Sequence, residues 1–142
     1  MPKGSGIDPT PISLSYIAGF IDADGTFHIG KKKDTRGKLG YVYQPCLNIY
    51  NNDITVLKSI RSDLGIGAIG LSSGKTYALR IYRMSDISKI LDLIIPYLRL
   101  KKERAILLKE WVDSRLSKAS HHYTNKEEEL AFQIGEMNRG GE

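Results

Sequence analysis

Cysteine is almost absent from this chain, which has 142 residues and a single cysteine, Cys46. One thiol excludes an intrachain disulfide framework and a zinc site built on clustered cysteines. Long apolar runs are also missing: no stretch reaches the roughly 18 apolar residues of a membrane span, and residues 1–8 lack the apolar core of a signal peptide. We therefore expect a soluble protein of a reducing intracellular compartment that is not secreted.

Acidic residues are in the minority, with 16 Asp and Glu against 21 Lys and Arg and a net charge of +5. So modest a surplus is compatible with nucleic acid binding but does not identify it. The basic residues gather in two blocks, at 31–38 and 99–104. Such runs are often only solvated surface, but one block follows an acidic motif and the other a predicted helix. This placement favours nucleic acid binding.

The length falls in the range of one domain and is sufficient for a core without disulfides. We expect a single domain over residues 1–142, with a core from about 12 to 118 and a C-terminal helix from about 124 to 138. No internal repeat is present.

Apolar periodicity predicts the elements of the first half. Thr10 and Pro11 are an expected N-cap and first helical residue, opening a helix that runs to about Ala23. Alternation predicts strands over residues 26–33 and 41–50. Asp53 is expected to cap a helix that ends at Gly65.

The second half is expected to begin with another strand pair, residues 68–71 and 77–84, joined through residues 72–75. A helix then starts at Ser85 and ends before Pro96. Residues 101–116 are also expected to be helical. Thr124 and Glu127 form a capping box for a last helix.

The segment from Tyr16 to Gly25 is the most informative one. Its apolar residues recur at helical spacing, while Gly19 and Ala23 stand four apart on a neighbouring face, where small residues let another backbone come close. Asp24 follows on that face, and Gly25 supplies a turn on which a helix stops. An ordinary amphipathic helix can also end in this way.

This decapeptide resembles the motif of the LAGLIDADG homing endonucleases and their intron maturase relatives. The resemblance implies an α+β fold, the αββαββα half-domain, whose antiparallel β saddle covers DNA and which dimerises through the motif helix. Tyr16, Gly19 and Ala23 would lie in the dimer interface. A single motif resembles the branch in which two copies form a homodimer, and a symmetric dimer is expected to read a long, nearly palindromic DNA target.

The resemblance also implies a metal site. Asp24 matches the metal-binding aspartate of the family, with the main-chain oxygen of Ala23 beside it. A hard cation held by few carboxylates, Mg²⁺ or another divalent cation, can activate water and neutralise a phosphate. Asp22 points elsewhere on the helix, and we interpret it as a structural residue that caps or bonds backbone.

Two further catalytic residues are implied by position. Lys101 resembles the active-site lysine of the family, the alternative being a solvated lysine at a helix start. Asn51 occupies a position where relatives often have a polar residue near the active-site water, the alternative being a turn before Asp53. An arginine that some relatives carry in the next helix is missing near Thr55.

The predicted strands also present an outward face for DNA. Arg80 suits guanine, and Gln44 or Asn48 suits adenine, in the major groove. The outward positions are His28, Gly30, Lys32, Asp34, Arg36, Gln44, Cys46, Asn48, Tyr50, Leu71, Ser73, Lys75, Arg80 and Tyr82. Expected phosphate contacts, which position the protein without reading sequence, are Lys31, Lys33, Lys38 and Lys102.

The expectation is a homodimeric, Mg²⁺-dependent, site-specific double-strand DNA endonuclease encoded within an intron, in a prokaryotic cytoplasm or an organelle matrix. The first alternative is a protein of the same fold that binds without cutting, either an RNA maturase or a DNA-binding regulator. A structural αβ dimer without a nucleic acid partner is the second, and the polar, basic sheet face argues against it.

Overall fold

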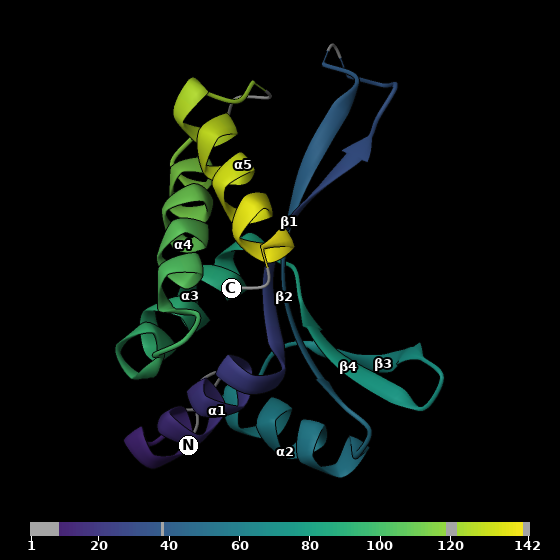
Figure 1. Cartoon of the computed structure of the whole chain (residues 1–142), viewed down its shortest axis with the longest axis vertical. Coiled ribbons are helices and arrows are strands. Elements are labelled where there is room, and N and C mark those ends of the chain that lie inside the picture. The colour runs from purple at the N-terminus through teal and green to yellow at the C-terminus, as the bar shows by residue number, and fades with distance from the viewer. Residues whose placement is uncertain (1–8, 38, 119–121, 141–142) are drawn as a thin grey trace.

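The computed structural model describes residues 9–37, 39–118 and 122–140, so Lys38, a predicted phosphate contact, lies outside the described residues. Two strand pairs, each preceded by a helix, and a run of helices after the second pair form an α+β fold (Figure 1), which confirms the predicted fold class. The elements are α1 (Pro11–Asp24), β1 (Gly25–Lys33), β2 (Tyr41–Asn51), α2 (Ile54–Leu64), β3 (Ala68–Ser73), β4 (Thr76–Ile81), α3 (Met84–Ile94), the 3₁₀ turn η1 (Ile95–Tyr97), α4 (Lys102–Leu116) and α5 (Asn125–Arg139).

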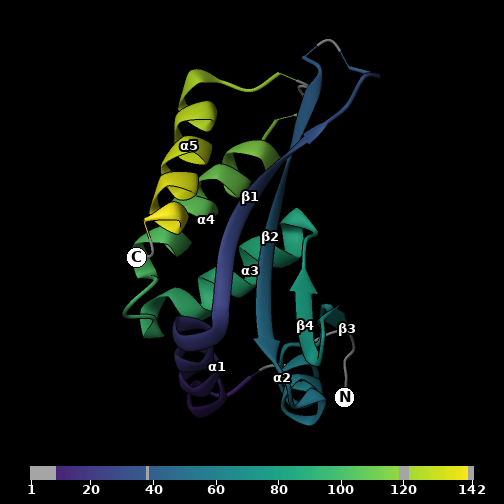
Figure 2. The same ribbon diagram turned by 45° about the vertical axis from the view of Figure 1, so that its right-hand side comes forward.

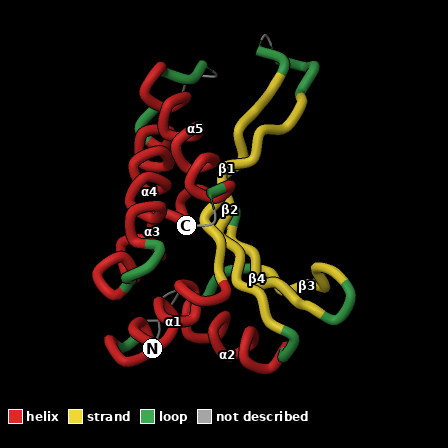
Figure 3. The backbone as a smooth tube through the Cα atoms, in the orientation of Figure 1, coloured by secondary structure: helices red, strands yellow, loops and turns green. Residues whose placement is uncertain are grey.

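The four strands form one antiparallel sheet in the order β1-β2-β4-β3. The described helices lie on one side of this sheet, while its other face is open and concave (Figures 1 and 3). Strands β1 and β2 continue far beyond β4 as a long hairpin (Figure 2). The sheet therefore offers an extended surface on the side away from the helices.

Side-chain caps fix the ends of the helices where the sequence predicts them. The Thr10 hydroxyl accepts from the amide of Ser13 at 3.1 Å and opens α1. The Asp53 carboxylate accepts from the amide of Thr55 at 2.9 Å and opens α2, which ends at Gly65 in the left-handed conformation, φ 75°. Such caps satisfy amides and carbonyls that lack intrahelical partners.

Alternation along β1 and β2 places one set of side chains in the core. Phe27 and Leu47 are fully buried beneath the helices, whereas His28 and Gln44 are exposed on the open face. The expected faces of these two strands are therefore confirmed. Helices α1, α3, α4 and α5 contribute Ile17, Ile21, Ile87, Ile90, Leu108, Trp111, Leu130 and Ile134 to the same core.

The second strand pair differs from the expectation. Strand β3 continues to Ser73 and β4 begins at Thr76, so only Gly74 and Lys75 form the turn, with Gly74 at φ 52°. Strand β4 ends at Ile81 instead of continuing to Met84, which is the first residue of α3.

An irregularity between Leu71 and Ser73 changes the face of β3. Leu71 pairs with Tyr77 and so shares the helix-facing side of the buried Leu79. The prediction that Leu71 lies on the open face is therefore wrong. A bulge shifts the alternation by one residue, and the sequence pattern does not reveal it.

None of the helices in the described parts of the chain is long and apolar enough to cross a membrane.

Candidate functional site

The last turn of α1 carries the carboxylates of Asp22 and Asp24 and no basic residue. The dipole of a helix and its unpaired carbonyls already make the potential negative at this end. Two carboxylates add to it. This end of α1 therefore favours cations beside it.

Asp22 uses its carboxylate to hold the start of α4. It accepts hydrogen bonds from the amides of Arg99 at 2.8 Å and Lys101 at 3.0 Å. Lys101 is the N-cap residue of α4 but makes no side-chain cap of its own. Asp22 therefore satisfies amides at that helix start, which confirms the prediction that it bonds backbone.

The side chain of Lys101 returns to the end of α1. Its ammonium donates to the carbonyl oxygens of Ile21, at 3.3 Å, and of Gly25. Burial lowers the pKa of Lys101 and the Arg104 guanidinium lowers it further, while the carboxylates of Asp22 and Asp24 oppose the shift. These contacts exclude the alternative that Lys101 is only a solvated lysine at a helix start.

Residue 25 must be glycine because a larger side chain would not fit there, and not because of its backbone conformation. Its φ is −108°, which any residue can adopt. A Cβ atom there would lie 2.8 Å from the Ile21 Cγ2 and 2.9 Å from the Ile21 carbonyl oxygen. Only glycine therefore lets β1 leave the end of α1 so tightly, with Asp24 at the point of exit.

Asp24 is exposed, and its carboxylate makes no hydrogen bond or ion pair within the described residues. No three His, Cys, Asp or Glu side chains come together as a metal site in the described parts of the chain. The end of α1 fits a divalent cation as an open site. It offers the Asp24 carboxylate and main-chain carbonyl oxygens, and the other ligands would come from outside this chain.

Asn51 ends β2 near this site, since Gly25 at the start of β1 pairs with Ile49. Its side-chain oxygen accepts from the amide of Asp53 at 2.8 Å. This is the turn that the sequence left as an alternative. A catalytic role for Asn51 stays a prediction.

One stripe of α1 faces away from the fold. Ile12 and Tyr16 are 83% and 54% exposed, and Gly19 and Ala23 continue the stripe at helical spacing. A Cβ atom at Gly19 would meet no described atom within 4 Å other than the backbone of its own helix. The packing of this chain therefore does not require glycine at residue 19.

The open sheet face is lined by polar side chains. Cross-strand pairs place His28 beside Cys46, and Asn48 between Thr26 and Arg80. Among the described strand residues of this face there is no carboxylate, so a polyanion would meet no repulsion there. The strand residues on this face are Thr26, His28, Gly30, Lys32, Val42, Gln44, Cys46, Asn48, Tyr50, Ala68, Gly70, Ser73, Thr76, Ala78 and Arg80.

Hydrogen bonds order the middle of this face. The Cys46 thiol donates to the Asn48 side-chain oxygen at 2.9 Å, and the Asn48 amide donates to the Tyr50 hydroxyl at 3.1 Å. Arg80 reaches the Ser72 hydroxyl at 3.4 Å. The sequence interpretation missed Ser72 and Thr26, although the alternation around Leu71 already indicated Ser72 and the alternation of β1 indicated Thr26.

The outer end of the hairpin holds several other predicted contacts. Asp34 accepts from the Arg36 amide at 3.0 Å and pairs with its guanidinium at 3.2 Å, and these interactions lower the pKa of Asp34. Lys31 lies on the opposite face, with its ammonium 4.1 Å from the ring centre of Tyr41. The exposed residues Lys33, Lys75 and Tyr82 lie at strand ends and turns, and Lys102 at the start of α4.

Comparison with known proteins gives a match to a sequence model described as LAGLIDADG endonuclease, over residues 17–111. A probable intron-encoded endonuclease, Cox1-I1b of Schizosaccharomyces pombe, is 32% identical over 103 residues, which cover 70% of this chain and 26% of the relative. The chain thus spans about a quarter of the length of this curated relative.

Solved structures share the fold. An archaeal intron-encoded homing endonuclease, I-Vdi141I complexed with DNA, superposes with a TM-score of 0.78 at 23% identity, covering 88% of this chain and 83% of that one. The LAGLIDADG meganuclease I-CpaMI bound to uncleaved DNA gives a TM-score of 0.73 at 25% identity, covering 85% of this chain and 42% of that one.

Proposed function

The chain belongs to the LAGLIDADG endonuclease family, and from this membership and the geometry of its open sheet face we propose that it is a site-specific endonuclease of double-stranded DNA. The observation that carries the proposal is the end of α1, where the half-buried ammonium of Lys101 lies with Asp24, which has no partner among the described residues, beside a sheet face whose described strand residues include no carboxylate. The I-Vdi141I and I-CpaMI structures contain DNA, which supports a duplex as the partner.

Two copies are needed because one chain supplies one acidic helix end. The exposed stripe of Tyr16, Gly19 and Ala23 supports a homodimer through α1, since the absence of a side chain at Gly19 lets a second helix approach closely. A dimer with twofold symmetry presents the same face twice, so the target is nearly palindromic. Each copy then cleaves one strand.

The Asp24 carboxylate and the Ala23 carbonyl oxygen are the groups of this chain that would hold Mg²⁺. A bound Mg²⁺ would supply an activated water and neutralise charge on the scissile phosphate. Lys101 presents a positive charge beside that position, fixed by its bonds to Ile21 and Gly25. The negative end of α1 attracts the cation, while Lys101 offsets the repulsion between Asp24 and DNA phosphates.

The face of the sheet supplies recognition. Arg80, Gln44 and Asn48 are the side chains suited to base edges in the major groove. Lysines at the strand ends and at the start of α4 suit phosphates. The name of the fission yeast relative, a probable intron-encoded endonuclease, supports an origin within an intron and thus an organelle matrix or a prokaryotic cytoplasm.

A selection of cleaved sites from a randomised duplex library, with Mg²⁺ present, tests the proposal. The native chain should enrich one nearly palindromic site cut on both strands, and Asp24→Asn should enrich none. Enrichment of bound but uncut duplexes by the native chain would instead show a binding protein, and enrichment of RNA in a parallel selection would show a maturase.

A further inference from the structure

Helix α5 makes hydrogen bonds to the β1–β2 hairpin from both its first turn and its last turn. In its first turn, the Glu128 carboxylate accepts hydrogen bonds from the hydroxyls of Tyr41 and Tyr43. In its last turn, the Asn138 amide donates to the carbonyl oxygen of Phe27 at 2.9 Å. Helix α5 lies outside residues 17–111, which match the family model.

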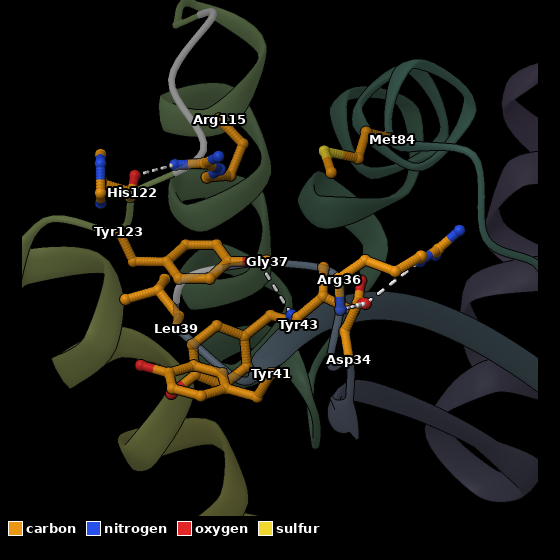
Figure 4. Close-up of a pocket in the computed structure, with 11 residues that line it drawn as sticks. Asp34, Arg36, Gly37, Leu39, Tyr41, Tyr43, Met84, Arg115, His122 and Tyr123 are labelled. Atoms are coloured by element: carbon orange, nitrogen blue, oxygen red, sulfur yellow. Dashed lines mark hydrogen bonds and ion pairs between the residues drawn. The ribbon is translucent and has the colours of Figure 1, made fainter.

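Packing against the helices is incomplete along the outer hairpin. A cavity of about 540 Å³ lies between the hairpin and the helices, with Tyr41, Tyr43 and Tyr123 gathered on one side and Met84 on another (Figure 4). Apolar contacts are lost wherever a cavity replaces them. The two hydroxyl bonds to Glu128 therefore add to the ring contacts that Tyr41 and Tyr43 make with Tyr123 and Trp111, and together these attach this part of β2 to the helical side.

The tyrosines are suited to remain donors. The hydrogen bond to Glu128 raises the pKa of Tyr41, and burial, followed by the bond to Glu128, raises the pKa of Tyr43. Both hydroxyls thus stay protonated at neutral pH. The Tyr43 amide also donates to the Tyr123 hydroxyl at 2.9 Å. This bond attaches the backbone of β2 at the same residue whose side chain bonds Glu128.

The residues that alternate with these tyrosines face the open side. Gln44 is the next residue after Tyr43 and pairs with Gly30, while Lys32 pairs with Val42 between the two tyrosines. Successive side chains of a strand point to opposite faces of the sheet from one shared backbone, so a backbone shift displaces the side chains on both faces. Any tilt of Tyr41 and Tyr43 therefore shifts Gln44 and Lys32 on the opposite face.

We propose that Glu128 is a positioning residue for DNA specificity, which holds the outer half of the β1–β2 hairpin through Tyr41 and Tyr43 so that Gln44 and Lys32 meet the outer base pairs of each half-site in one register. The inference rests on the proposed function. The hairpin tip lies far from the end of α1 (Figures 1 and 2), so these base pairs are distant from the cut.

The test compares Glu128→Gln with Glu129→Gln, an exposed neighbour on the same helix with the same change in charge. The glutamine keeps the volume but replaces one acceptor oxygen by an amide donor, so one tyrosine can no longer donate to it and the charge-assisted character of both bonds is lost. Glu128→Gln should reduce discrimination at the outermost base pairs by about tenfold and leave the central pairs and the cleavage rate at saturation unchanged. Tyr41→Phe combined with Tyr43→Phe should reproduce this profile.

Hydrogen exchange of the free proteins separates this inference from the proposed function. Amides of residues 28–44 should exchange faster in Glu128→Gln than in the native chain or in Glu129→Gln. An unchanged exchange rate, or equal loss of discrimination at all base pairs, would overturn the role of Glu128. A native chain that binds no DNA site would refute the proposed function and the specificity role, whereas faster exchange would still show that Glu128 holds the hairpin.

Discussion

Asp22 and Lys101 bond crosswise between two helices. The Asp22 carboxylate accepts from the Lys101 amide at the start of α4, and the Lys101 ammonium donates to carbonyls at the end of α1. Each residue thus caps the helix to which the other belongs. The relationship assigns the two aspartates of the motif to different tasks: Asp22 joins the helices, whereas the Asp24 carboxylate has no partner in the part of the chain that the structure describes.

Asp22→Asn should destabilise the fold by about 1–3 kcal/mol, because an amide replaces one of the two oxygens that accept from backbone. Equilibrium urea unfolding measures the difference. The matched control is Asp24→Asn: the native Asp24 carboxylate accepts no such bonds from the described residues, so this variant should unfold at the same urea concentration as the native chain. Equal destabilisation by both changes would remove the distinction between the two residues.

Asp24→Asn should abolish cleavage while DNA affinity stays within a few fold of the native value. The change removes the proposed metal ligand, but it also removes a negative charge facing phosphates. Single-turnover cleavage and a binding titration in Ca²⁺ separate the two effects. Cleavage at a comparable rate in Mg²⁺ would show that Asp24 is not the ligand.

Gly19→Leu should block dimerisation without unfolding the chain. No described atom outside the backbone of α1 itself lies within 4 Å of a Cβ at residue 19, so the added volume would meet only the proposed second copy, where overpacking costs about 1–3 kcal/mol or more. Gly25→Ala is the contrasting variant, since its Cβ would lie 2.8 Å from Ile21, and it should lower the melting temperature instead. Sedimentation velocity and thermal unfolding distinguish them; a native monomer on DNA would contradict the dimer.

Arg80→Ala should relax preference at one base pair of each half-site, at a cost of about 1–3 kcal/mol if the contact is bidentate. Lys33→Ala should weaken binding to all sequences alike and reduce the slope of log affinity against log salt by about one per lost phosphate contact. Affinities for single-base variants at several salt concentrations provide the measurement. Uniform weakening by Arg80→Ala would show that the open face does not read bases there.

Glu127→Gln should lower stability by about 2 kcal/mol near neutral pH, a difference that disappears in acid. Burial alone would raise the pKa of Glu127, but hydrogen bonds from Ser114, the Thr124 amide and Arg115 outweigh it and the pKa is lowered. A carboxyl whose pKa is lowered in the folded state stabilises the fold at a pH above its ordinary pKa of 4.5. This contribution is lost as the pH falls through the folded-state pKa. Urea unfolding of both chains from pH 3 to 7 is the test.

Local signals predicted much of the fold. The caps at Thr10 and Asp53, the stop at Gly65 and the alternation in the first two strands each act within a few residues of chain, so the sequence displays them. The second hairpin is harder to predict from the sequence. The bulge before Ser73 depends on pairing with β4 and leaves no mark in the alternation of β3.

Contacts between distant residues were the least predictable part of the site. The sequence placed Asp24 and Lys101 in one site only through the family resemblance. It gave no sign that Glu128 receives hydrogen bonds from Tyr41 and Tyr43, which precede it by 87 and 85 residues. Such pairs are set by how α5 packs against the sheet, and neither propensity nor periodicity carries that information.

The crosswise bonds also constrain when the site exists during folding. Asp22 and the Lys101 amide are 79 residues apart in the chain, and closing so long a loop is among the later and slower steps of folding. A growing chain that has emerged only as far as α3 contains Asp24 but not the groups that fix the end of α1. Under the proposed function, the end of α1 is therefore complete only once the start of α4 has docked on it, and a chain that ends at α3 is expected not to cut DNA.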